Sequence, residues 1–106
     1  MKYKIVLACA LGMSTAIMVK KIRNAASDRG IEIECDAYSV NVVKTVAEDA
    51  DCLLLGPQAA FLLDQIQAEL PNVPVAVIPM QDYGTMNGEH VFHLALSLIN
   101  QERGEK

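Results

Sequence analysis

The sequence has no excess of positive charge and no long apolar run. Nine Lys and Arg residues stand against 13 Asp and Glu residues, which gives a formal net charge of −4. Nucleic acid is not expected as the main partner, because its phosphates require a basic protein face. No apolar segment reaches the roughly 18 residues that a membrane-spanning helix needs. The sequence therefore predicts no transmembrane helix.

Cysteine is scarce, and its spacing is uninformative for disulfides or metals. The chain has Cys9, Cys35 and Cys52, an odd number with no C-x-x-C pair. This pattern argues against a disulfide framework and predicts a reducing, cytoplasmic compartment. No metal motif is visible, and no cofactor is expected. Cys35 and Cys52 lie inside apolar strand patterns, and we interpret both as buried core residues.

The composition that is present predicts one globular domain over residues 1–106. Apolar residues make up 52% of the chain and charged residues 21%, which is a globular balance. Internal repeats, linkers and low-complexity segments are absent from the sequence. A single 106-residue domain is long enough to bury a core without covalent staples.

Strand and helix patterns alternate along the chain. Apolar and β-branched runs predict strands at 3–8, 31–38, 51–55 and 75–78. Helical spacing predicts helices at 13–29, 39–49, 59–70 and 91–100, with Gly30 ending the first helix. Residues 79–90 are interpreted as a long loop, and the tail from 101 is expected to fray. The alternation predicts an α/β fold, a four-stranded parallel sheet with helices on both faces in a three-layer αβα arrangement. The strand at 31–38, which alternates apolar and acidic residues, is expected at an edge.

Cys9 ends the first predicted strand, and a helix begins about four residues later. The loop between them consists of Ala10, Leu11, Gly12, Met13, Ser14 and Thr15. Amides at a helix start make an anion site, and the same field favours thiolate over thiol. The pattern indicates phosphoryl or sulfuryl chemistry on sulfur, or a redox role. The alternative is a structural cysteine that ends a strand.

A cysteine phosphatase is the first enzymatic alternative. The C-x5-R pattern of those enzymes would place arginine at position 15, where this chain has Thr15. Asp82, after the fourth strand, is the candidate general acid. Without the arginine clamp the site could accept a phosphoryl group without hastening attack by water. A carrier therefore fits better than a low-molecular-weight cysteine phosphatase or arsenate-reductase-like enzyme. A non-catalytic regulatory domain of the same fold is a second alternative.

Several segments together resemble one known family. These are LACALGMSTAIMVKKI, DADCLLLGPQAAFLL, LPNVPVAVI and DYGTMNGEHV, which cover nearly the whole chain. They resemble the lactose/cellobiose-type (chitobiose) enzyme IIB of the bacterial sugar phosphotransferase system. The resemblance implies strand order 2-1-3-4 and a phosphocysteine carrier. Such a carrier takes phosphate from a phosphohistidine on enzyme IIA. It passes the phosphate to a sugar held by the membrane permease enzyme IIC, here a β-linked disaccharide such as cellobiose, chitobiose or lactose.

The resemblance also assigns roles to individual residues. Cys9 matches the phosphorylated cysteine, and Ala10 to Thr15 match the phosphate-binding loop. The family often has serine directly after the cysteine, so Ala10 removes one hydroxyl donor here. Gln58 either lines the site or is an ordinary polar residue at a helix start. His90 and His93 are interpreted as solvated or capping residues. Leu11 and Met13 are expected to contact docking partners.

Overall fold

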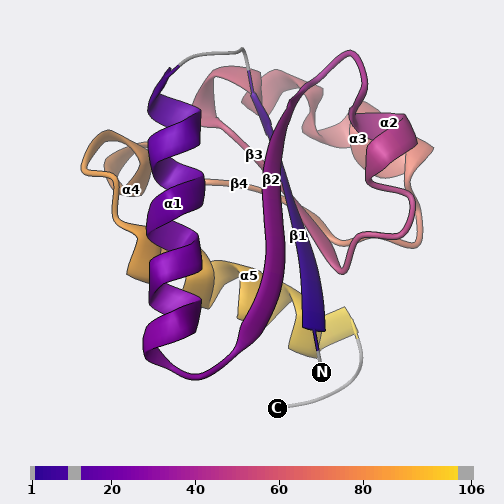
Figure 1. Ribbon diagram of the computed structural model, residues 1–106. Helices are drawn as coiled ribbons and strands as arrows, with labels where there is room; N and C mark the ends of the chain where they lie inside the picture. Colours follow the sequence, from indigo (N-terminus) through magenta and orange to yellow (C-terminus); the bar gives the residue numbers. More distant parts are fainter. Residues whose placement is uncertain (1, 10–12, 103–106) are drawn as a thin grey trace.

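A four-stranded parallel sheet forms the centre of the molecule (Figure 1). The computed structural model describes residues 2–9 and 13–102, and only the backbone of residues 9, 13, 14 and 102. The strands are β1 (Lys2–Cys9), β2 (Glu32–Ser39), β3 (Cys52–Leu55) and β4 (Val75–Val77). Their order is β2-β1-β3-β4, and every neighbouring pair is parallel. The predicted α/β fold and strand order are confirmed.

Burial explains which strands lie inside the sheet. All four residues of β3 are buried, as expected of a short apolar strand covered on both faces. β2 pairs only with β1, and its exposed Glu32 and Glu34 alternate with more buried residues. The expectation that this strand lies at an edge is confirmed.

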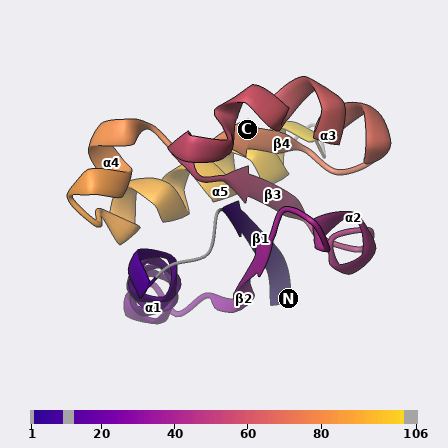
Figure 2. The same cartoon turned by 90° about the horizontal axis from the view of Figure 1, so that it is seen from above.

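Helices cover both faces of the sheet, which confirms the three-layer arrangement (Figure 2). On one face, α1 (Met13–Asp28) and α5 (Gly88–Glu102) pack over the side of β1 that presents Ile5 and Leu7. On the other face lie α2 (Val43–Val46), the 3-10 helix η1 (Pro57–Leu62) and α3 (Leu63–Glu69). Their core includes Val6 and Ala8, the alternate residues of β1.

Three predicted element bounds are wrong. The predicted helix at 39–49 is only α2, four residues long, in a segment rich in valines that resist helix formation. The predicted loop at 79–90 contains the short helix α4 (Met80–Gly84) and the start of α5. That start precedes the predicted one because the Asn87 side chain accepts a hydrogen bond from the amide of His90. Helix α5 also continues through residues 101 and 102, where fraying was expected.

The predicted end of α1 at Gly30 is confirmed. Gly30 has a φ of 69°, in the left-handed region that glycine adopts without strain. Its amide donates to the Ser27 carbonyl at 3.0 Å, and the next amide, of Ile31, donates to the Ala26 carbonyl at 2.9 Å. This pair of hydrogen bonds is the Schellman arrangement, which satisfies the last carbonyls of a helix. It turns the chain directly into β2.

Candidate functional site

The carboxyl ends of the inner strands form one continuous edge. The amide of Gly56, just after β3, donates to the Ala8 carbonyl at 2.9 Å. The amide of Ile78, just after β4, donates to the Leu55 carbonyl at 2.8 Å. The segments that follow β3 and β4 therefore leave the sheet beside the end of β1. In open parallel sheets, ligands bind at this edge.

Cys9 lies at this edge as the last residue of β1, with its backbone in register with Ser39 of β2. The 16-residue helix α1 begins at Met13, four positions later. Ala10, Leu11 and Gly12 lie outside the described residues, and Cys9, Met13 and Ser14 are described as backbone only. The first amides of α1 have no partner within the helix, so the positive end of the helix faces the same edge. The strand end and helix start that the sequence predicted around the loop are confirmed.

Thr15, the last residue of the predicted loop, is buried in the first turn of α1 and contacts Tyr83. Its exposed fraction is 4%, and no other polar or charged side chain is buried among residues 2–9 and 13–102. The Oγ1 atom of Thr15 lies 3.2 Å from the hydroxyl oxygen of Tyr83 in α4. Sequence reasoning missed Tyr83 because it was assigned to a loop. An aromatic ring with a polar tip in a turn-rich segment was the available signal.

Gln58 is exposed and is the second residue of η1, which follows β3. The hydrogen bond between Gly56 and Ala8 brings the start of η1 to the end of β1. This position is compatible with a residue that lines the site. The role of Gln58 stays a prediction.

Asp82, His90 and His93 belong to surface networks. Asp82 Oδ1 lies 3.1 Å from Nδ1 of His90, whose ring is exposed. Arg29 Nη2 lies 2.9 Å from Nε2 of His93, which is also exposed. Since arginine can only donate, Nε2 of His93 is an acceptor in this arrangement. Both histidines face solvent, as interpreted from the sequence.

Cys35 and Cys52 are buried core residues, as predicted. Both lie in register with Ile5, one on each side of β1. Burial raises the pKa of the Cys35 thiol to about 12, and burial likewise raises the pKa of Cys52. Neither sulfur is therefore a nucleophile at neutral pH.

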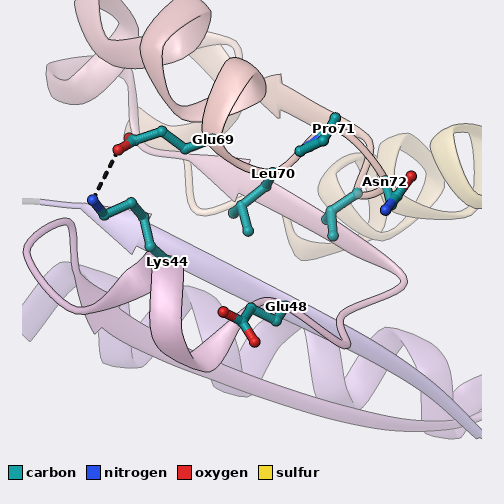
Figure 3. A pocket seen from close by; sticks show the side chains of 7 residues that line it. Lys44, Glu48, Glu69, Leu70, Pro71 and Asn72 are labelled. Atoms are coloured by element: carbon teal, nitrogen blue, oxygen red, sulfur yellow. Dashed lines mark hydrogen bonds and ion pairs between the residues drawn. The ribbon is translucent and has the colours of Figure 1, made fainter.

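A cleft of about 630 Å³ lies between α2 and the end of α3 (Figure 3). The Lys44 ammonium and the Glu69 carboxylate form an ion pair there at 2.8 Å. The rest of the lining comes from Glu48 and from residues 70–73. These segments lead into the amino ends of β3 and β4. The cleft thus lies away from the edge that carries Cys9.

Metal and membrane features were also sought in the described part of the chain. Within residues 2–9 and 13–102, no group of three His, Cys, Asp or Glu side chains could hold a metal ion. In those same ranges, no helix has the length and apolar character required to cross a membrane.

Comparisons with known proteins agree with this geometry. The family model described as PTS system, Lactose/Cellobiose specific IIB subunit, matches residues 4–94. The cellobiose-specific EIIB component of Lactococcus lactis subsp. lactis (strain IL1403) is 44% identical, over 91% of this chain and 95% of its own. The oligo-beta-mannoside-specific EIIB component of Bacillus subtilis (strain 168) is 41% identical, over 92% of this chain and 98% of its own.

Solved structures share the fold. The solution structure of the cellobiose-specific phosphotransferase IIB component from Borrelia burgdorferi has a TM-score of 0.80 and 33% identity, covering 95% of this chain and 94% of its own. The lactose-specific IIB domain from Streptococcus pneumoniae has a TM-score of 0.81 at 12% identity, covering 92% of this chain and 98% of its own, and supports the fold alone. With these matches over nearly its whole length, the chain belongs to the lactose/cellobiose-specific IIB family, the phosphotransferase components of the sugar phosphotransferase system.

Proposed function

We propose that this protein is a cytoplasmic phosphocysteine carrier that works between enzyme IIA and enzyme IIC. One observation carries the proposal. In a chain of the IIB family, Cys9 ends an inner strand at the carboxyl edge of the sheet, and α1 starts four positions later. A helix start stabilises both a thiolate and a phosphoryl dianion.

The transfer consists of two in-line displacements at phosphorus. In the first, the Cys9 thiolate attacks the phosphohistidine of enzyme IIA. The N–P bond breaks as the S–P bond forms, and the histidine ring leaves with its nitrogen lone pair. In the second, a sugar hydroxyl held by enzyme IIC attacks the phosphorus and loses its proton, and the S–P bond breaks. The loop amides from Ala10 to Thr15 stabilise the charge in both steps.

Exposed apolar side chains support sequential docking at this edge. In the described part of the chain, four large apolar side chains are exposed, and each follows the carboxyl end of a different strand. They are Ile17 in α1, Val42 after β2, Phe61 in η1 and Met80 in α4. Exposed apolar groups on a small protein mark contact surfaces, and methionine adapts to more than one partner. Leu11 and Met13 are proposed to extend this surface.

The proposed sugar is a β-linked disaccharide such as cellobiose, chitobiose or lactose. Relatives named for cellobiose, galactose and oligo-beta-mannoside match with 44%, 43% and 41% identity. These values are too similar to select one sugar. In the proposed relay the sugar is held by enzyme IIC, so this chain contributes the phosphoryl group alone.

Reconstitution of the relay tests the proposal. The protein is incubated with phosphoenolpyruvate, the general phosphotransferase components, enzyme IIA, enzyme IIC membranes and each candidate sugar. We expect sugar phosphate with the wild-type chain and with Cys35→Ala, and none with Cys9→Ser. Sugar phosphate formed by Cys9→Ser would contradict the proposal. Hydrolysis of p-nitrophenyl phosphate above the Cys9→Ser background would instead support a phosphatase.

A further inference from the structure

The contact between Thr15 and Tyr83 joins the predicted phosphate loop to a helix from the other end of the sequence. The two hydroxyl oxygens are 3.2 Å apart, within hydrogen-bond distance, and the residues are 68 positions apart. Both are buried, with exposed fractions of 4% for Thr15 and 9% for Tyr83. A buried hydroxyl pair of this kind is held by its surroundings and screened from water.

The segment that carries Tyr83 is fixed against α1 (Figure 1). At the start of α5, a Cβ on Gly88 would lie 2.5 Å from the carbonyl carbon of Lys21 in α1. The two helices therefore approach so closely that only glycine fits. The Asn87 amide donates to the Asp82 carbonyl at 2.8 Å, and Met86 closes the turn with a φ of 53°. This turn holds α4 at the distance that lets Tyr83 reach Thr15.

The direction of the hydroxyl pair matters for an anion in the loop. A threonine hydroxyl has one proton and two lone pairs, and a tyrosine hydroxyl is also both donor and acceptor. If the Tyr83 hydroxyl donates to Thr15 Oγ1, the Thr15 proton points to a different acceptor. An anion at a helix start rewards this arrangement, because hydrogen bonds to charged acceptors are about twice as strong as neutral ones.

We propose that Tyr83 is a positioning residue for phosphoryl transfer. Its hydroxyl donates to Thr15 and thereby directs the Thr15 hydroxyl proton to the anion held in the loop, first the Cys9 thiolate and then the phosphoryl group. The inference rests on the proposed carrier function. It assigns to α4 a role in the site that the strand-end loop alone would not reveal.

The test compares Tyr83→Phe, Thr15→Val and the double variant with the wild-type chain. Tyr3→Phe is the matched control, since Tyr3 lies near the amino end of β1. Thr15→Ser keeps the hydroxyl and controls for the lost methyl group. One readout is the rate at which Cys9 accepts phosphate from phosphorylated enzyme IIA. The other is the pH dependence of Cys9 alkylation, which requires no phosphoryl donor. Melting temperatures report whether each variant folds.

We expect Tyr83→Phe to slow phosphoryl acceptance about three- to tenfold and to move the alkylation midpoint to higher pH. The double variant should be no slower than Thr15→Val alone, because Tyr83 acts through Thr15. Tyr3→Phe and Thr15→Ser should stay within about twofold of wild type. An unchanged rate and midpoint in Tyr83→Phe, or additive losses in the double variant, would overturn the inference.

The two proposals fail in different ways. A wild-type chain that accepts no phosphate overturns the carrier function. The alkylation midpoint then still decides on Tyr83: a shift in Tyr83→Phe supports its positioning of Thr15 toward the thiolate, and no shift overturns it.

Discussion

The three cysteine side chains have different chemical surroundings. Cys35 and Cys52 lie in the interior of the sheet, where desolvation holds the pKa of each thiol far above its ordinary value. Cys9 ends a strand just before a helix start. Helix starts lower thiol pKa values, so the same residue type is expected to be inert at two positions and reactive at the third.

This difference predicts selective alkylation of the folded protein. With a pKa of about 12, only about one Cys35 in ten thousand is thiolate at pH 8. Iodoacetamide at that pH should add one group per chain, on Cys9, with a half-maximum below pH 8.5. Intact mass and peptide mapping measure this, and Cys9→Ser should remain unlabelled. Labelling of folded Cys9→Ser, or a half-maximum at or above pH 8.5, would contradict the reactive environment assigned to Cys9.

A second residue-scale prediction concerns Glu89 and pH. Arg29 donates to Glu89 Oε2 at 2.6 Å, and this hydrogen bond lowers the pKa of Glu89 below its usual 4.5. A lowered carboxyl pKa in the folded state stabilises the fold above pH 4.5, and this contribution is lost as pH falls through the lowered pKa.

Urea unfolding should therefore show Glu89→Gln slightly less stable than wild type at pH 7, by the small amount typical of exposed pairs. The difference should shrink toward pH 3, and also in 1 M salt, because salt screens exposed charges. The same difference at both pH values would show that the carboxylate charge is not its cause.

At the scale of elements, the close crossing of α1 and α5 depends on Gly88. A Cβ there would meet the Lys21 backbone at 2.5 Å, and backbone cannot rotate out of the way. Gly88→Ala should destabilise the protein by about 1–3 kcal/mol in urea unfolding. Gly84→Ala is the matched control, because a Cβ at position 84 has nothing within 4 Å and should change stability by less than about 0.5 kcal/mol. Equal effects of the two substitutions would mean that the crossing tolerates a side chain.

The elements also show how far sequence reasoning reaches. The buried run of β3 and the glycine stop after α1 follow from local patterns, so both were predictable. The order of strands was not, because periodicity carries no information about which strands are neighbours, and the family resemblance supplied it. The contact of Thr15 with Tyr83 spans 68 positions, and α4 is too short to show a helical period. Long-range pairs between short elements leave little trace in one sequence.

For the whole molecule, the carboxyl edge of the sheet combines the thiol with exposed apolar groups. Phe61 and Met80 have exposed fractions of 82% and 76%, so replacing them with serine should leave stability nearly unchanged. If enzyme IIA docks on this surface, Phe61→Ser/Met80→Ser should slow phosphoryl acceptance about tenfold in stopped-flow or rapid-quench assays. Asn72→Ala, in the cleft beyond the end of α3, is the control and should transfer at the wild-type rate. Normal transfer by the double variant would place docking elsewhere.

The central claim is that Cys9 carries the phosphoryl group, and intact mass with peptide mapping tests it most directly. The protein is incubated with phosphoenolpyruvate, the general phosphotransferase components and enzyme IIA, without enzyme IIC. One phosphoryl group per chain should appear on the peptide that contains Cys9, and Cys9→Ser should acquire no transferable phosphate. A phosphoryl group that persists in Cys9→Ser, or one that maps to His90 or His93, would contradict the phosphocysteine carrier.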